Sequence, residues 1–133
     1  MANQVSDIKV GIIGAGTMGE AFIAALIRSG IAPTSISVVV RRPERGDELA
    51  KRYSITVEPL EHSLATSDVV ILGIKPQGLA ELLPQVAPHI KPDSLVISLL
   101  AGKTISAIAT GLSGHKAIAR VMPNTPTLIG KGM

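Results

Sequence analysis

Residues 8–19 read I-K-V-G-I-I-G-A-G-T-M-G, and this stretch decides the fold that we expect for the whole chain. Its first half is short, apolar and rich in β-branched side chains, which is typical of a buried strand. Three glycines follow with the spacing G-x-G-x-x-G, at Gly14, Gly16 and Gly19, and a segment of helical periodicity begins immediately after them. A strand, a glycine-rich turn and a helix in this order predict a dinucleotide-binding turn.

Each glycine of this turn has its own physical role. The first permits the tight turn out of the strand, the second lacks a Cβ so that a pyrophosphate can approach the backbone, and the third lets the helix pack closely on the strand. The free N–H groups at the start of the helix would face the anion. The alternative is a glycine-rich turn that binds no ligand. We predict cofactor contacts along the turn itself, which comprises Ile13, Gly14, Ala15, Gly16, Thr17 and Met18.

The composition indicates one globular domain. The chain has 133 residues, of which 46% are hydrophobic and 17% are charged. No apolar run reaches the roughly 18 residues that span a membrane, and the first residues lack the basic flank and apolar segment of a signal peptide. We therefore expect a cytoplasmic protein without a membrane segment.

Charge and residue usage narrow the classes of ligand. Aromatic residues make up only 2% of the chain and its basic residues are scattered, which argues against a nucleic-acid surface. The net charge of +3 suits a polyanionic small molecule. The chain has no cysteine, and its three histidines, His62, His89 and His115, lie far apart. We expect no metal site.

Strand-like and helix-like segments alternate along the rest of the chain. Apolar, β-branched runs predict further strands over 36–40, 55–57, 69–74, 95–99 and 117–121. Helical periodicity predicts helices from Gly19 to about Ser29, over 47–53, over 60–66, over 79–86 with an end or a kink at Pro84, and after a cap at Thr104. This alternation predicts an α/β fold: a doubly wound, mostly parallel sheet of the Rossmann type in three α/β/α layers. Residues 1–133 would form a single dinucleotide-binding domain.

Two arginines follow the second predicted strand. Ligands of open α/β sheets lie beyond the carboxyl ends of the strands, and NAD-binding proteins usually place an acidic residue after the second strand to bind the ribose 2′-hydroxyl. This chain has Arg41 and Arg42 there, and no carboxylate before Glu44. Guanidinium groups suit a 2′-phosphate. We therefore predict NADP(H) in preference to NAD(H); the alternative is that both arginines are solvated surface charges.

Three later segments also follow predicted strands on the ligand side of the sheet. Ile74, Lys75 and Pro76 are candidates to line the ribose, and Leu100, Ala101 and Gly102 are candidates to line the nicotinamide. The alternative is that these residues only end the strands and begin the loops.

The third such segment, M-P-N-T-P at 122–126, has two prolines that fix the backbone around Asn124 and Thr125. Their polar side chains could orient a nicotinamide amide or a substrate, although a structural turn is an equal alternative. No residue pattern indicates a strong general acid or base.

These pieces together resemble the amino-terminal domain of the pyrroline-5-carboxylate reductase family. The matching pieces are the turn from Val10 to Gly19, I-K-P at 74–76, A-G-K-T-I at 101–105 and R-V-M-P-N-T-P at 120–126. Their order and spacing cover essentially the whole chain. The last piece is the specific one, because the glycine motif is shared with many dinucleotide enzymes.

The resemblance implies the last step of proline biosynthesis, in which a hydride passes from NAD(P)H to C5 of the cyclic imine 1-pyrroline-5-carboxylate and gives L-proline. Family members carry a second, helical domain that forms the dimer and holds the substrate. We therefore expect this chain to be the cofactor-binding portion, inactive by itself, and the full-length protein to be a homodimer or a larger homo-oligomer. Two alternatives stay open: another NADP-linked reductase with a similar amino-terminal domain, such as a deazaflavin-linked or 3-hydroxy-acid enzyme, and an NADP-binding module without activity.

Overall fold

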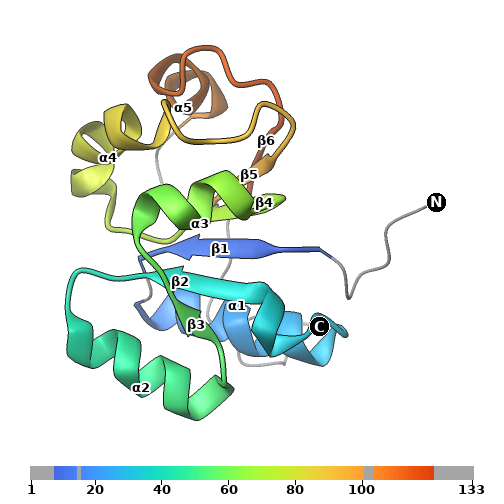
Figure 1. Ribbon diagram of the computed structural model, residues 1–133. Helices are drawn as coiled ribbons and strands as arrows, with labels where there is room; N and C mark the ends of the chain where they lie inside the picture. Colours follow the sequence, from blue (N-terminus) through green and yellow to red (C-terminus); the bar gives the residue numbers. More distant parts are fainter. Residues whose placement is uncertain (1–7, 15, 101–103, 122–133) are drawn as a thin grey trace.

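The computed structural model describes residues 8–14, 16–100 and 104–121. They form a six-stranded sheet in the order β3-β2-β1-β4-β5-β6, in which all five strand pairs are parallel (Figure 1). The strands are β1 (Val10–Ile13), β2 (Ile36–Val39), β3 (Thr56–Val57), β4 (Val69–Leu72), β5 (Leu95–Ser98) and β6 (Ile118–Arg120). The α-helices are α1 (Thr17–Arg28), α2 (Pro43–Tyr53), α3 (Leu60–Thr66), α4 (Leu79–Val86) and α5 (Ile105–Gly111), and two 3₁₀ turns are η2 (Pro33–Ser35) and η3 (Pro76–Gly78).

Helices cover both faces of the sheet, which confirms the predicted three-layer α/β/α fold. Residues of α1 and α2 pack in the core on one face of the sheet, and residues of α3, α4 and α5 pack in the core on the other face. Successive residues of a strand point to opposite faces, so Ile12 joins the core on the α1 side and Ile13 joins the core on the α4 side. Because both faces are buried, the strands read in the sequence as nearly continuous apolar runs.

The order of the strands reverses at β1, because β2 and β3 lie on one side of it and β4, β5 and β6 lie on the other. Ile13 pairs with Val39 of β2 on one side and with Leu72 of β4 on the other. The connection that leaves β1 therefore runs toward β2, whereas the strands that follow β4 build outward on the opposite side. Doubly wound sheets bind their ligands at this divergence, beyond the carboxyl ends of the strands.

Local residues cap two helices, and the cap predicted at Thr104 is confirmed. Gly30 follows α1 with φ +107°, and Ile31 N–H donates a hydrogen bond to the carbonyl oxygen of Leu26 at 3.1 Å, as in a glycine-terminated helix end. The Thr104 hydroxyl accepts a hydrogen bond from Ala107 N–H at 3.0 Å and caps α5.

Two predicted helix boundaries are wrong. Helix α2 begins at Pro43 and not at Asp47, because proline suits the first helical turn. Gly46 is buried within this helix, and a Cβ there would come within 3.1 Å of Val40 and Val57, so its small size lets α2 lie close to the sheet. Helix α1 begins at Thr17, before Gly19. Helix α4 covers the predicted residues Leu79–Val86, and Pro84 does not end it. The predicted strands keep their positions, but several end one or two residues earlier.

Asp68 lies at the edge of the sheet opposite the carboxyl ends of the strands and forms hydrogen bonds there with two other segments. Its carboxylate accepts hydrogen bonds from the side chain of Lys91 at 2.7 Å and from Lys9 N–H at 3.1 Å. These two bonds lower the pKa of Asp68. Its role is therefore to join the starts of β1 and β4 to the loop before β5. None of the helices in the described ranges combines the length and apolar character needed to cross a membrane.

Candidate functional site

The turn after β1 requires a glycine at its first position. Gly14 has φ +81°, and its N–H donates a hydrogen bond to the carbonyl oxygen of Val39 at 2.8 Å. A Cβ on Gly14 would come within 2.6 Å of the Ile74 side chain and 3.1 Å of the Ile74 backbone nitrogen. Both the backbone conformation and the space exclude a larger residue.

The second glycine opens the start of α1 to solvent. Gly16 is exposed and is the N-cap of α1, and its carbonyl oxygen accepts a hydrogen bond from Glu20 N–H at 2.9 Å. Among the described residues, and apart from its chain neighbours and the backbone of its own helix, no heavy atom lies within 4 Å of the position that a Cβ would occupy there. The first N–H groups of a helix have no partner within the helix, so a phosphate can approach them through this opening. The turn therefore fits the pyrophosphate of a dinucleotide.

A further glycine, which we did not single out in the sequence, brings β4 against the same turn. Gly73 N–H donates to the carbonyl oxygen of Ile13 at 2.9 Å, and a Cβ on Gly73 would come within 2.7 Å of the carbonyl oxygen of Gly14. The backbones that leave β1 and β4 are thus in direct contact. Half-buried Ile74 follows immediately and lies against Gly14, and exposed Lys75 is the next residue.

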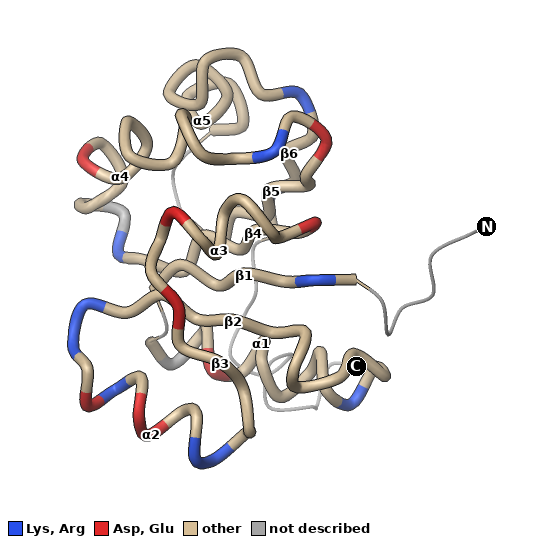
Figure 2. The backbone as a smooth tube through the Cα atoms, viewed as in Figure 1, with Lys and Arg blue, Asp and Glu red and all other residues tan. Residues whose placement is uncertain are grey.

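Arg41 and Arg42 lie at the same edge, where β2 leads into α2. Both residues are exposed, and neither guanidinium group makes a hydrogen bond or ion pair within the part of the chain that the structure describes. Figure 2 shows this connection as a basic stretch that precedes the mixed charges of α2. A groove lined by Arg42, Glu44, Arg45 and Glu48 runs along α2 from this point. The arrangement offers two uncompensated cations to an anion.

A cluster of charged and polar side chains joins α1 to α2, and the sequence analysis missed it. Glu20, in the first turn of α1, accepts hydrogen bonds from Arg45 and from the hydroxyl of Tyr53, each at 2.8 Å, and from Arg52. Glu48 of α2 contacts the same two arginines, at 2.8 Å and 3.2 Å. The spacing of Arg45, Glu48 and Arg52 predicts pairs along one helix, but only the structure places Glu20 against them.

The environment of Glu20 favours its ionised form. Burial by itself would raise the pKa of the carboxyl group, but the hydrogen bonds from Tyr53, Arg45 and Arg52 outweigh burial and lower the pKa to about 2. The pKa of Tyr53 is raised, first by burial and then by its hydrogen bond to Glu20. The Glu20 carboxylate therefore stays ionised throughout the neutral and mildly acidic range.

The remaining predicted site residues differ in burial, and some of them lie outside the described residues. The side chains of Ile13 and Leu100 are 3% and 2% exposed and belong to the core, so only their backbones can reach a ligand. Met18 is half-buried at the start of α1. The predictions on Ala15, Ala101, Gly102, Asn124 and Thr125 lie outside the described residues, as do those on the side chains of Thr17 and Pro76.

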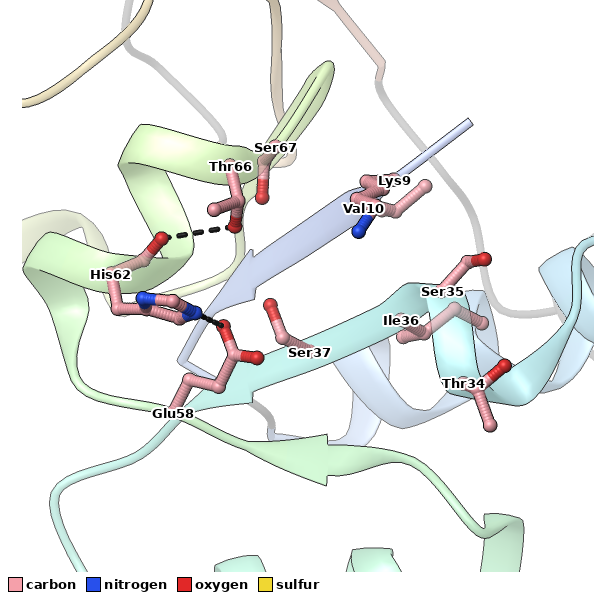
Figure 3. A pocket seen from close by; sticks show the side chains of 10 residues that line it. All are labelled: Lys9, Val10, Thr34, Ser35, Ile36, Ser37, Glu58, His62, Thr66 and Ser67. Carbon is pink, nitrogen blue, oxygen red and sulfur yellow. Dashed lines mark hydrogen bonds and ion pairs between the residues drawn. The ribbon is translucent and has the colours of Figure 1, made fainter. Parts of the chain in front are cut away.

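A second hollow, of about 70 Å³, lies on the sheet face beside α3 and reaches the starts of β1 and β2 (Figure 3). Its lining is largely polar and includes Ser37, whose hydroxyl lies 2.8 Å from that of Ser63. At one end His62 Nε2 and Glu58 Oε1 are 3.8 Å apart. Among the described residues, no three histidine or acidic side chains gather as a metal site would require.

Comparison with known proteins gives a consistent result. The sequence profile of the family described as NADP oxidoreductase, coenzyme F420-dependent, matches residues 9–102. The chain is 39% identical over 129 residues to the pyrroline-5-carboxylate reductase of Corynebacterium melassecola, covering 93% of this chain and 47% of that protein. It is 42% identical over 129 residues to the reductase of Synechocystis, covering 96% and 48%. The chain thus spans about half the length of the curated relatives it matches.

The fold also matches a solved reductase. The structure of a pyrroline-5-carboxylate reductase from Coxiella burnetii superimposes with a TM-score of 0.84 at 27% sequence identity, covering 92% of this chain and 46% of that one. The described sheet and its helices therefore have the architecture of about half of that protein.

Gly14→Ala is expected to reduce stability, whereas Gly16→Ala is expected to reduce the affinity for NADPH. Gly14→Ala should lower the free energy of unfolding by about 2 kcal/mol, because it strains a positive φ and meets Ile74. Gly16→Ala should change stability by less than about 0.5 kcal/mol, but weaken NADPH binding at least about tenfold by filling the opening at the start of α1. Urea unfolding and equilibrium titration measure the two effects. Unchanged NADPH affinity in a stable Gly16→Ala protein would contradict the proposed anion site.

Glu20→Gln should destabilise the chain in a pH-dependent way. A carboxyl group whose pKa falls on folding stabilises the native state above its unfolded pKa, near 4.5, and loses this effect as the pH falls toward its folded pKa, about 2. The variant should therefore be less stable than the parent by about 2 kcal/mol near neutral pH, with the difference shrinking below pH 4.5. Urea unfolding at a series of pH values tests this. A constant difference between the two proteins down to the acid limit would argue against an ionised Glu20.

Proposed function

The chain belongs to the family of NADP oxidoreductases described as coenzyme F420-dependent, and from this premise we propose that it is the cofactor-binding portion of a pyrroline-5-carboxylate reductase. One observation carries the proposal: a glycine turn leaves the start of α1 open at the point where the strand order of the sheet reverses. The chain that forms this turn matches such reductases along 93% to 96% of its length. The rest of the relatives' length would hold the substrate and form the homo-oligomer. We assign the reaction to the cytoplasm.

The residues at the carboxyl edge suit NADP(H) in preference to NAD(H). Gly14, Gly16 and the first N–H groups of α1 would hold the pyrophosphate. Arg41 and Arg42 would pair with the 2′-phosphate, because charge-assisted hydrogen bonds between guanidinium and phosphate are strong. Ile74 and Lys75, which follow β4 beside the turn, would border the ribose. When bound, NADPH supplies the hydride of the reaction.

In the proposed reaction the main role of the protein is to orient the substrate relative to the cofactor. A cyclic imine that is protonated at nitrogen has an electrophilic C5, and addition of a hydride at C5 gives the secondary amine without a further proton transfer. Glu20 and Asp68, for example, are held by cations away from such a role. Aligning the two carbons between which the hydride moves can supply much of the rate.

A deazaflavin-linked NADP reductase is the second candidate, because the description of the family names coenzyme F420. The two candidates use the same glycine turn and differ in what receives the hydride. The match of 39% to 42% identity with pyrroline-5-carboxylate reductases supports imine reduction. A direct assay of both acceptors separates the two candidates.

Replacing the arginine pair should reverse the cofactor preference. The parent chain is expected to bind NADPH at least about tenfold more tightly than NADH, through charge-assisted bonds to the 2′-phosphate. In the double variant Arg41→Glu, Arg42→Ser, an acidic residue can instead bind the 2′-hydroxyl of NADH. Equilibrium titration of both proteins with both cofactors measures this. If the variant kept the parent's affinity for NADPH, the two arginines would not be phosphate ligands.

Imine reduction can be tested in a chimera. Residues 1–133 replace the matching half of the Corynebacterium melassecola reductase, so that the remaining half of that protein is supplied intact. The purified chimera is expected to oxidise NADPH when given 1-pyrroline-5-carboxylate and to release proline. A chimera carrying Gly16→Ala is the control, since it should fold and lose most of the rate. A folded chimera that binds NADPH but reduces only F420 would favour the second candidate.

A further inference from the structure

We propose that Glu20 is a positioning residue for cofactor selection, because it sets the distance between the glycine turn and the two arginines that follow β2. The inference rests on the proposed function and adds a residue that does not itself touch the cofactor. Glu20 belongs to α1, which begins at the turn, whereas its cationic partners belong to α2, which begins directly after Arg42. The carboxylate thus links the two elements that carry the two halves of the site.

The link reaches the arginine pair through the first turn of α2. Glu20 Oε1 lies 2.8 Å from Nη2 of Arg45, one helical turn beyond Arg42. The backbone N–H groups of Arg45 and Gly46 donate to the carbonyl oxygen of Arg42 at 3.1 Å and 3.3 Å. Holding the side chain of Arg45 therefore holds the first turn of α2, and this turn holds the backbone of Arg42.

The same carboxylate also fixes the far end of α2. Its Oε2 accepts hydrogen bonds from Arg52 and from the Tyr53 hydroxyl, at the last turn of the helix. Arg45 and Arg52 lie two turns apart on α2, so one acidic side chain of α1 contacts both ends of one face of its neighbour. The side chain of Glu20 is 21% exposed, so water screens these contacts only in part.

A fixed distance matters more for one cofactor than for the other. A dinucleotide with a 2′-phosphate must meet the turn and the arginines at the same time, and a site already held in that geometry loses less conformational entropy on binding. A dinucleotide without that phosphate meets only the turn. Loosening α2 relative to α1 should therefore weaken NADPH binding more than NADH binding.

Glu48 provides a matched control. It contacts the same two arginines as Glu20 and carries the same charge, but it lies on α2 itself, and within the described residues both of its ion pairs are made inside that helix. Glu20→Gln and Glu48→Gln each remove one negative charge beside Arg45 and Arg52. Only the first of them removes a contact between the two helices.

The experiment compares the ratio of the dissociation constants for NADH and NADPH in the parent, Glu20→Gln and Glu48→Gln chains. We expect Glu20→Gln to lower this ratio by about threefold to tenfold and Glu48→Gln to leave it within about twofold. An unchanged ratio in Glu20→Gln would mean a purely structural role, and an increased ratio would mean a charge effect; either result would overturn the proposal. If the parent bound neither cofactor, the proposed function would fail first.

Two additional measurements keep the test decisive. Glu20→Asp retains the charge but shortens the side chain, so positioning predicts a lowered ratio even if Glu20→Gln fails to fold, whereas a pure charge effect predicts no change. Hydrogen exchange of the Arg45 and Gly46 amides needs no cofactor. It should be faster in Glu20→Gln than in Glu48→Gln, and equal rates would contradict the link between the helices.

Discussion

The contact between the backbones that leave β1 and β4 is the constraint on which the site depends. β1 and β4 are parallel neighbours, so the segments that follow them leave the same edge of the sheet side by side. Here the approach is so close that a Cβ on Gly73 would come within 2.7 Å of the Gly14 carbonyl oxygen, and a Cβ on Gly14 within 2.6 Å of Ile74. Glycine at both positions permits this close approach, and Gly16, two residues after Gly14, leaves the start of α1 open to solvent. The fold and the proposed ligand site therefore both depend on this glycine turn.

Much of this could be predicted from the sequence, because the relevant signals are local. Parallel strands with both faces buried appear as short apolar runs, and the caps at Gly30 and Thr104 depend on residues within one turn of the helix end. The order of strand, glycines and helix from 8 to 19 needs no distant partner. These local features were sufficient to predict the doubly wound sheet and the position of the glycine turn.

The failures have a common physical cause, which is dependence on distant residues. The start of α2 was predicted at Asp47, yet the helix already includes Gly46, which is buried against Val40 and Val57 and lets α2 approach the sheet. Glu20 is separated from Arg45, Arg52 and Tyr53 by 25, 32 and 33 residues, so no helical spacing could reveal the cluster. Leu100 follows a strand, as a ligand-lining residue should, but its side chain points into the core with 2% exposure. Position along the chain predicts which edge a residue occupies, and only packing decides where its side chain points.

The placement of charge explains how a chain with a net charge of only +3 can present a cationic site. Glu20 is paired with Arg45 and Arg52, and Asp68 with Lys91, so these acids are neutralised where they stand. Arg41 and Arg42 have no acidic partner within the described residues, and they lie where β2 meets α2 at the carboxyl edge of the sheet. The positive N-terminal end of α1 opens at that edge as well. Two unpaired guanidinium groups and the start of α1 therefore lie at the same edge of the sheet, and a polyanion at this edge would meet a more positive field than the net charge alone indicates.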